Sequence, residues 1–192
     1  EAVDIDSDGH WIILGADGNP KPIAEQTSDD KRVVGNGLPK HFASWNNTFR
    51  YENFDLEVNM RGAFKFQIIN YARIWYEAPV NLNRGNVLNT VYHDIFGKRP
   101  LNDMEDFQYL SYYVEDGDYW KIDNITLGYN LNLANSLVRQ LRIYLSGSNL
   151  ATFTDYSGID PEVNVLGLSP GADYKNRYPT SRIITLGANV TF

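Results

Sequence analysis

The stretch Phe54–Ile68, FDLEVNMRGAFKFQI, decides the fold class of this chain of 192 residues. Its even-numbered positions are apolar or glycine, and its odd-numbered positions are polar or charged except for Ala63. Successive side chains of a β-strand point to opposite faces, whereas an α-helix would scatter both sets around its axis. The stretch therefore predicts one long strand that has an apolar face and a polar face.

The same alternation returns upstream in 42–51, less cleanly, and downstream in 119–131, 141–151 and 184–192. Short links separate the strands within a pair, and long segments rich in Gly, Pro, Asp and Asn separate the pairs. This spacing is typical of an all-β antiparallel meander with its long loops on one side. Outside the strands we expect only a short strand at Trp11–Leu14 and a helical turn at Tyr71–Tyr76.

Composition excludes several classes of protein. Hydrophobic residues make up 43% and charged residues 21%, which indicates a folded chain rather than a disordered one. The absence of cysteine excludes disulfides, thiol catalysis and cysteine-based zinc sites. A net charge of −7 argues against a nucleic-acid partner.

No catalytic constellation is visible, so we expect no enzyme. Because Glu1 is not an initiator Met, we expect the chain to be processed or part of a longer one.

A soluble β-sandwich would show similar alternation, but three features favour a membrane barrel. The strands are long enough to cross an apolar band when tilted, the loops are asymmetric, and aromatic residues gather near the strand ends. Five strands cannot close a barrel, so the rest of the same barrel must lie elsewhere. Lys121 and Asp123 share the parity of Ile125, so we expect Tyr119–Asp123 to stand above the lipid unless a bulge intervenes.

The barrel hypothesis assigns each segment to a side of the membrane. We expect external loops at 1–41, 69–117 and 152–181, hairpins at 42–68 and 118–151, and a terminal strand at 182–192. The polar parity should face the lumen through Asp55, Glu57, Asn59, Arg61, Asn124, Thr126, Arg142, Ser146 and Ser148. The last eight residues resemble the terminal signal by which outer-membrane proteins engage their assembly machinery, with Thr185, Gly187, Val190 and Phe192 at its key positions.

Several motifs in order resemble the C-terminal end of one family, the SusC/RagA TonB-linked outer-membrane proteins of Bacteroidetes. The motifs are GNGLP at Gly35–Pro39, NNTFRYENFDL at Asn46–Leu56, VEDGDY at Val114–Tyr119 with NITLGY at Asn124–Tyr129, SGSNL at Ser146–Leu150 with DPEV at Asp160–Val163, and YPTSR at Tyr178–Arg182. No single motif is specific, but their combination and order are.

The resemblance implies a 22-stranded barrel in the outer membrane of a Gram-negative bacterium, with an N-terminal plug and a TonB-contacting segment that these residues do not include. It also implies a SusD-like surface lipoprotein, with which the barrel imports oligosaccharides or peptides. No binding residue is carried across from the family. The alternatives are a siderophore or cobalamin receptor of the TonB-dependent type, and a soluble β-sandwich module that binds glycans.

Two loop features add expectations about ligands. Aromatic residues of the long loops could stack on sugar rings, contact the lipoprotein or pack against each other; they are Trp75, Tyr76, Tyr109, Tyr112, Tyr113, Phe153 and Tyr156. No cofactor is required, but Asp4, Asp6, Asp8 and Gly9 have the spacing that opens an EF-hand calcium loop. Gly15 stands where that loop needs a bidentate Glu, and the later Asp29 or Asp30 that the resemblance suggests follows a longer insert.

Overall fold

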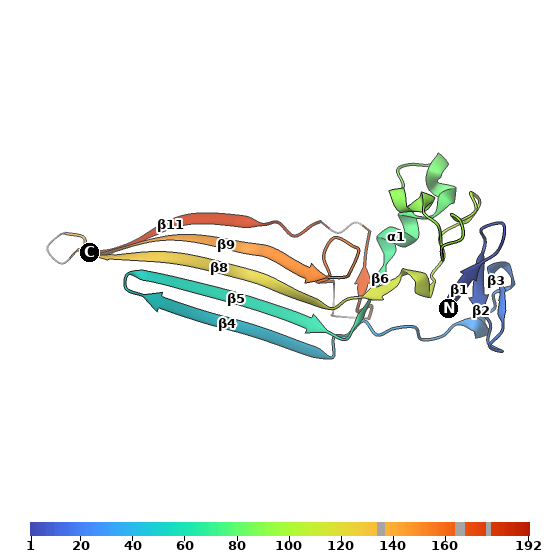
Figure 1. Cartoon of the computed structure of the whole chain (residues 1–192), viewed down its shortest axis with the longest axis horizontal. Helices are drawn as coiled ribbons and strands as arrows, with labels where there is room; N and C mark the ends of the chain where they lie inside the picture. The colour runs from blue at the N-terminus through green and yellow to red at the C-terminus, as the bar shows by residue number, and fades with distance from the viewer. Residues whose placement is uncertain (134–136, 164–167, 176–177) are drawn as a thin grey trace.

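Five long strands form one antiparallel sheet at one end of the molecule, and short elements gather at the other end (Figure 1). This computed structural model describes residues 1–133, 137–163, 168–175 and 178–192. The strands lie in the order β11-β9-β8-β5-β4. Their bounds are β4 His41–Tyr51, β5 Phe54–Phe64, β8 Tyr119–Asn132, β9 Gln140–Thr154 and β11 Ile183–Thr191. β4 and β11 each pair on one side only within the described residues.

The register gives this sheet two chemically different faces. One row across the five strands consists of Phe49, Leu56, Leu127, Leu145 and Leu186. The neighbouring row consists of Thr48, Glu57, Thr126, Ser146 and Thr185, and its side chains point to the opposite face because side chains alternate along every strand. We call these the apolar face and the polar face. The large side chains of the apolar row are about half exposed or more, apart from that of Leu56.

The predicted uninterrupted strand from Phe54 to Ile68 is wrong in its last part. Lys65 has a φ of 61°, which ends β5, and its backbone N–H donates to Asp118 at 2.5 Å. The chain resumes as β6, Gln67–Asn70, in a separate sheet between β10, Ala172–Asp173, and β7, Val114–Asp116. The alternation persisted through the break because β6 is also two-faced, with Ile68 fully buried.

A β-bulge at Asp123 accounts for the charged residues that broke the parity of β8. Asn59 pairs with Asn124 and Met60 with Ile122, so Asp123 is an extra residue in β8. The bulge turns Lys121 to the polar face, opposite Arg61. The sequence allowed two explanations for these charged residues, a strand that stands above the lipid or a bulge, and the structure contains the bulge.

The expected loops carry their own small fold at the far end of the molecule. β1 Ala2–Ile5, β2 Trp11–Leu14 and β3 Pro20–Pro22 form a three-stranded sheet, where the sequence predicted only the second strand. The expected helical turn is α1, Tyr71–Tyr76. Five 3-10 helices complete the described elements: Ile23–Glu25, Ser28–Asp30, Pro79–Asn83, Asn89–Tyr92 and Ser111–Tyr113.

Trp11 centres the hydrophobic core of this far end. Its side chain is 1% exposed and packs with Ile5, Ile13 and Ile74. Burying side chains of this size contributes about 2 kcal/mol each, which is how segments read as loops acquire a fixed structure. No helix among the described residues is long and apolar enough to cross a bilayer.

Candidate functional site

The polar face brings together all nine residues that the sequence assigned to the lumen. The register pairs Glu57 with Thr126 and Asn59 with Asn124, and it pairs the latter with Ser148 on β9. The nine are Asp55, Glu57, Asn59 and Arg61 from β5, Asn124 and Thr126 from β8, and Arg142, Ser146 and Ser148 from β9. They form three groups along the strands, with ion pairs in the two end groups and mainly hydroxyls and amides in the middle one.

The first charged group lies toward the short links. Arg142 binds the Asp55 carboxylate, with Nη2 2.5 Å from Oδ2, and the Asn130 amide donates to Oδ1 at 2.6 Å. Gly128 lies beneath the pair, and a Cβ there would be 2.6 Å from both the Arg142 and Asp55 side chains. The glycine therefore leaves the space in which the ion pair forms.

The middle group is a belt of hydroxyls and amides. Asn124 Nδ2 donates to the hydroxyls of Ser146 at 3.0 Å and Ser148 at 3.2 Å. Thr126 Oγ1 lies 2.8 Å from the Ser146 hydroxyl and donates to Asn124 Oδ1 at 3.0 Å. Glu57 pairs with Thr126 at the level of this belt and accepts the Asn59 amide at 2.9 Å, and the ion pairs of the polar face lie at its two ends.

The second charged group lies at the loop end and centres on Lys121. Its side chain is only 2% exposed, and its Nζ lies 2.5 Å from Glu162 and 3.8 Å from Asp160. Arg61 also binds Glu162, and its Nε lies 3.3 Å from Asp123. Residues 155–163, which we call the fold-back segment, thus return over the polar face and are tied to β5 and β8.

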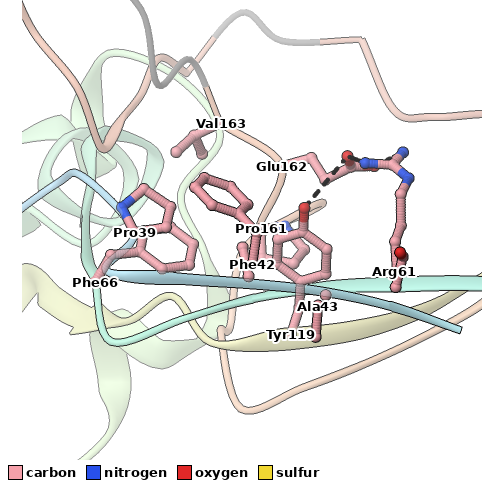
Figure 2. Close-up of a pocket in the computed structure, with 12 residues that line it drawn as sticks. Pro39, Phe42, Ala43, Arg61, Phe66, Tyr119, Pro161, Glu162 and Val163 are labelled. Atoms are coloured by element: carbon pink, nitrogen blue, oxygen red, sulfur yellow. Dashed lines mark hydrogen bonds and ion pairs between the residues drawn. The ribbon is translucent and has the colours of Figure 1, made fainter.

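A hollow of about 430 Å³ lies beside this contact. Figure 2 shows Glu162 between the Tyr119 hydroxyl and Arg61, with Phe42, Phe66 and Val163 forming an apolar wall. Sequence reasoning missed Lys121, Asp160 and Glu162 as members of the site. The sequence offered one indication of these contacts. Lys121 occupies a position of apolar parity, and a lysine that is buried requires carboxylate partners.

Arg73 joins the loop elements through a second ion-pair centre outside the long sheet. Its guanidinium binds Glu77 and Glu115, each at 2.9 Å. The Ser157 backbone N–H and hydroxyl both donate to Glu115 at 2.8 Å, which ties the fold-back segment to β7. Burial opposes the charge of Glu115, but the bonds from Arg73 and Ser157 outweigh it and hold the pKa of this carboxyl below its ordinary value.

Three of the seven predicted loop aromatics are packed into the protein. Tyr112 and Tyr113 contact the Trp11 ring at centroid distances of 5.1 and 6.2 Å. Burial raises the pKa of the Tyr113 hydroxyl. Tyr156 is buried, and its hydroxyl donates to Asp173 at 2.6 Å.

The other predicted aromatics keep accessible surface. Trp75 lies 4.9 Å from Phe107, and Tyr109 is 66% exposed. Tyr76 is half-buried, and Phe153 lies opposite Trp120 on the apolar face of the long sheet rather than in a loop. Contact of these residues with sugars or a lipoprotein stays a prediction.

Two aspartates of the predicted calcium loop have protein partners at their carboxylates. Asp4 Oδ2 lies 2.5 Å from Lys98 Nζ, and Asp6 Oδ1 accepts the backbone N–H groups of Asp8 and His10 at 2.9 Å. Among residues 1–133, 137–163, 168–175 and 178–192 no group of three carboxylates or histidines has the arrangement of a metal site. The calcium hypothesis stays a prediction.

Comparison with known proteins decides the family. No protein-family model matches the chain. TonB-dependent receptor P3 of Formosa agariphila is 30% identical over 203 residues, which covers 97% of this chain and 19% of that protein. TonB-dependent receptor SusC of Bacteroides thetaiotaomicron is 28% identical over 149 residues, or 74% of this chain and 14% of that protein. The structure of the RagAB peptide transporter matches all of this chain and 22% of its own, with a TM-score of 0.82 and 21% identity. The chain belongs to the SusC/RagA family.

This SusC/RagA chain spans about a fifth of the length of the curated relatives it matches. Its all-β antiparallel sheet is accordingly one portion of a larger barrel, as the strand count predicted. The resemblance that the sequence suggested is confirmed by these relatives.

Two of the SusC/RagA motifs have visible structural roles. Asn36 of the GNGLP motif accepts the Gln67 N–H with its carbonyl, and its own N–H donates to the Gln67 side chain, both at 2.8 Å. A Cβ on Gly37 would lie 2.0 Å from the Pro170 carbonyl oxygen, so this close approach requires glycine. The DPEV motif supplies Asp160 and Glu162 to the Lys121 group. Both motifs therefore attach loops to the strands.

The C-terminal residues of this SusC/RagA chain form the outer part of the described sheet. Thr185 and Gly187 on β11 pair with Ser146 and Tyr144, and Val190 pairs with Leu141. Phe192 follows the strand and is 73% exposed. A role of this segment in barrel assembly stays a prediction.

Proposed function

We propose that the complete protein is a TonB-dependent importer of the outer membrane that takes up oligosaccharides or peptides with a SusD-like surface lipoprotein. The observation that carries the proposal is the two-faced sheet: an apolar row at one level of all five strands and a polar row beside it. Such a sheet suits a barrel wall with lipid outside and a polar lumen inside. Membership of the SusC/RagA family and the name of RagAB, a peptide transporter, support the transport role.

In this proposal the polar face meets the lumen and the plug, which lies in another part of the protein. The long loops lie outside the cell, and the short links and Phe192 lie on the periplasmic side. The fold-back segment then narrows the lumen at its extracellular end, because its carboxylates bind Lys121 and Arg61 on the inner wall. TonB would act through the absent N-terminal region and supply the energy for uptake.

The proposal is tested in the bacterium with the full-length gene. Cells that lack the gene should lose uptake of a labelled oligosaccharide or peptide pool, and the gene in trans should restore it. Deleting tonB should abolish uptake in the wild type. The receptor extracted from outer membranes in mild detergent should co-purify with a lipoprotein that mass spectrometry identifies.

Two outcomes would contradict the proposal. Uptake that persists without TonB would remove the energy coupling. Recovery of the polypeptide in the aqueous fraction after membrane extraction would return the sheet to a soluble role. A siderophore or cobalamin receptor would show TonB-dependent uptake of those ligands and no lipoprotein partner.

A further inference from the structure

A second pocket lies between α1, the fold-back segment and the residues that follow β10. Its volume is about 350 Å³, within the range of small-molecule sites. Tyr76 on α1 and Tyr174 after β10 line it, together with Ile159 from the fold-back segment. We call it the Tyr174 pocket. It is separate from the hollow beside Glu162, with which it shares no lining residue.

Tyr174 is an exposed aromatic ring that the protein holds in place. Tyr71 stacks on it with the ring centroids 5.4 Å apart and the planes 19° from parallel. Tyr174 nevertheless keeps 54% of its surface exposed. Next to it, Lys175 places its Nζ 3.3 Å from the centroid of the Trp75 ring. An aromatic ring fixed in this way can receive a ligand without ordering a side chain first.

The polar groups deep in the Tyr174 pocket are also fixed. Asn70 is 1% exposed, and its amide donates to Glu115 at 3.2 Å and to the Ser157 hydroxyl at 3.4 Å. Asp173 is 5% exposed and accepts the Tyr156 hydroxyl. These bonds preorganise the wall of the pocket before any ligand enters.

The charged groups that line the pocket are engaged inside the protein. The Arg73 guanidinium is neutralised by Glu77 and Glu115, and the Lys175 ammonium lies over the Trp75 ring. The Asp173 carboxylate is buried and accepts the Tyr156 hydroxyl, so a ligand with free carboxylate or ammonium groups would lose its hydration and meet only charges that the protein already engages. By contrast, the Tyr76 and Tyr174 hydroxyls have no hydrogen-bond partner in the described part of the chain, so both can bond to a ligand.

We propose that the Tyr174 pocket binds a neutral pyranose ring of an oligosaccharide. The C–H groups of a sugar ring carry partial positive charge and suit the electron-rich face of the Tyr174 ring. The sugar hydroxyls can bond to the two free phenol hydroxyls. The inference deepens the proposed function, on which its role in import rests, because it assigns the neutral oligosaccharides as ligands of these external loops.

The test measures binding to the full-length receptor purified in detergent. The probes are arrays of short neutral oligosaccharides, acidic oligosaccharides and short peptides. The best neutral oligosaccharide should bind Tyr174→Ala about tenfold more weakly than wild type, because one stacking contact is lost. Tyr174→Phe keeps the ring and should retain most of the affinity. Tyr92→Ala, which removes a tyrosine that is 61% exposed and outside the pocket, is the matched control.

A second variant allows the site to be tested even if Tyr174→Ala does not fold. If Tyr174→Ala fails the heat-modifiability test on gels, Tyr76→Phe, which removes one free hydroxyl and keeps its ring, should still weaken binding measurably. Equal binding by wild type and the pocket variants would overturn the site. Binding restricted to peptides or acidic oligosaccharides, or no binding on any array, would overturn the ligand class.

The same variants separate this inference from the proposed function. If the pocket binds neutral oligosaccharides but cells import them without TonB, the importer role fails and the subsite stands. If import is TonB-dependent and binding is unchanged in Tyr174→Ala, the subsite fails and the importer role stands.

Discussion

Leu145 provides a quantitative test of which face of the sheet meets lipid. It lies five residues after Gln140 at the start of β9 and is 50% exposed on the apolar face. With Gln140 as the lower boundary, the rise is about 17 Å along the strand, or about 13 Å of height at a tilt of ~40°. That is near the middle of an apolar band about 25 Å tall, where a lysine costs about 2–4 kcal/mol. Leu145→Lys should lower the free energy of unfolding by that amount.

Two matched variants fix the interpretation. Phe153 is on the same face but thirteen residues from Gln140, at a height of about 33 Å, so Phe153→Lys should cost only about 0–1 kcal/mol. Thr48 lies in the adjacent polar row and pairs with Glu57, so Thr48→Lys places the new charge next to a carboxylate. We expect little or no loss from it.

The assay is guanidinium unfolding of the full-length receptor refolded in phosphatidylcholine vesicles, followed by tryptophan fluorescence. The midpoints convert to free energies only if the slopes of the transitions agree among the variants. The reasoning is refuted if Thr48→Lys lowers the free energy of unfolding as much as Leu145→Lys does. It is also refuted if Phe153→Lys lowers it more than Leu145→Lys does. Either result would mean that the apolar face is not the lipid face.

Three further predictions concern the loop end. Lys121→Ala should cost about 3 kcal/mol in the same assay because it removes the buried ammonium that the Glu162 and Asp160 carboxylates surround, whereas Arg61→Gln, at a side chain 42% exposed, should cost about 1 kcal/mol or less; equal losses would argue against a buried centre at Lys121. Asn70 accepts the Arg73 N–H at 3.1 Å and caps α1, so Asn70→Ala should cost about 1 kcal/mol and speed hydrogen exchange in 71–77, and unchanged exchange would contradict the cap. The Glu105 hydrogen bond raises the pKa of His10, so this contact stabilises the fold below the unfolded pKa of about 6.5 and is lost as pH rises through the folded value. Proteolysis of the N-terminal segment should therefore be faster at alkaline pH than at acidic pH in the wild type. The difference between the two rates should be smaller in His10→Gln.

The strands could be predicted because alternation is a local property that both faces of the long sheet preserve. Leu56 and Glu57 show their faces without any knowledge of their neighbours. The end of β5 could not be found in this way, because Lys65 takes its positive φ from the turn it makes toward Asp118. The alternation continued through β6 and concealed the change of sheet.

The candidate site was predictable in membership but not in contacts. Parity placed Asp55 and Arg142 on one face, yet only the register brings them within 2.5 Å. Lys121 reaches that face through the bulge at Asp123, and its partner Glu162 comes from a loop more than forty residues away along the chain. Such long-range pairs depend on how a loop folds back, which neither periodicity nor composition encodes.

The two outermost strands of the described sheet, β4 and β11, have a consequence for handling the polypeptide. Each leaves a row of backbone N–H and C=O groups without a neighbouring strand among the described residues, and each carries exposed apolar side chains such as Phe49 and Leu186. Unpaired strands of this kind are templates for self-association. These residues expressed alone should collect in inclusion bodies rich in β-structure. In the larger barrel, strands from the rest of the protein would pair with these edges and leave no open template.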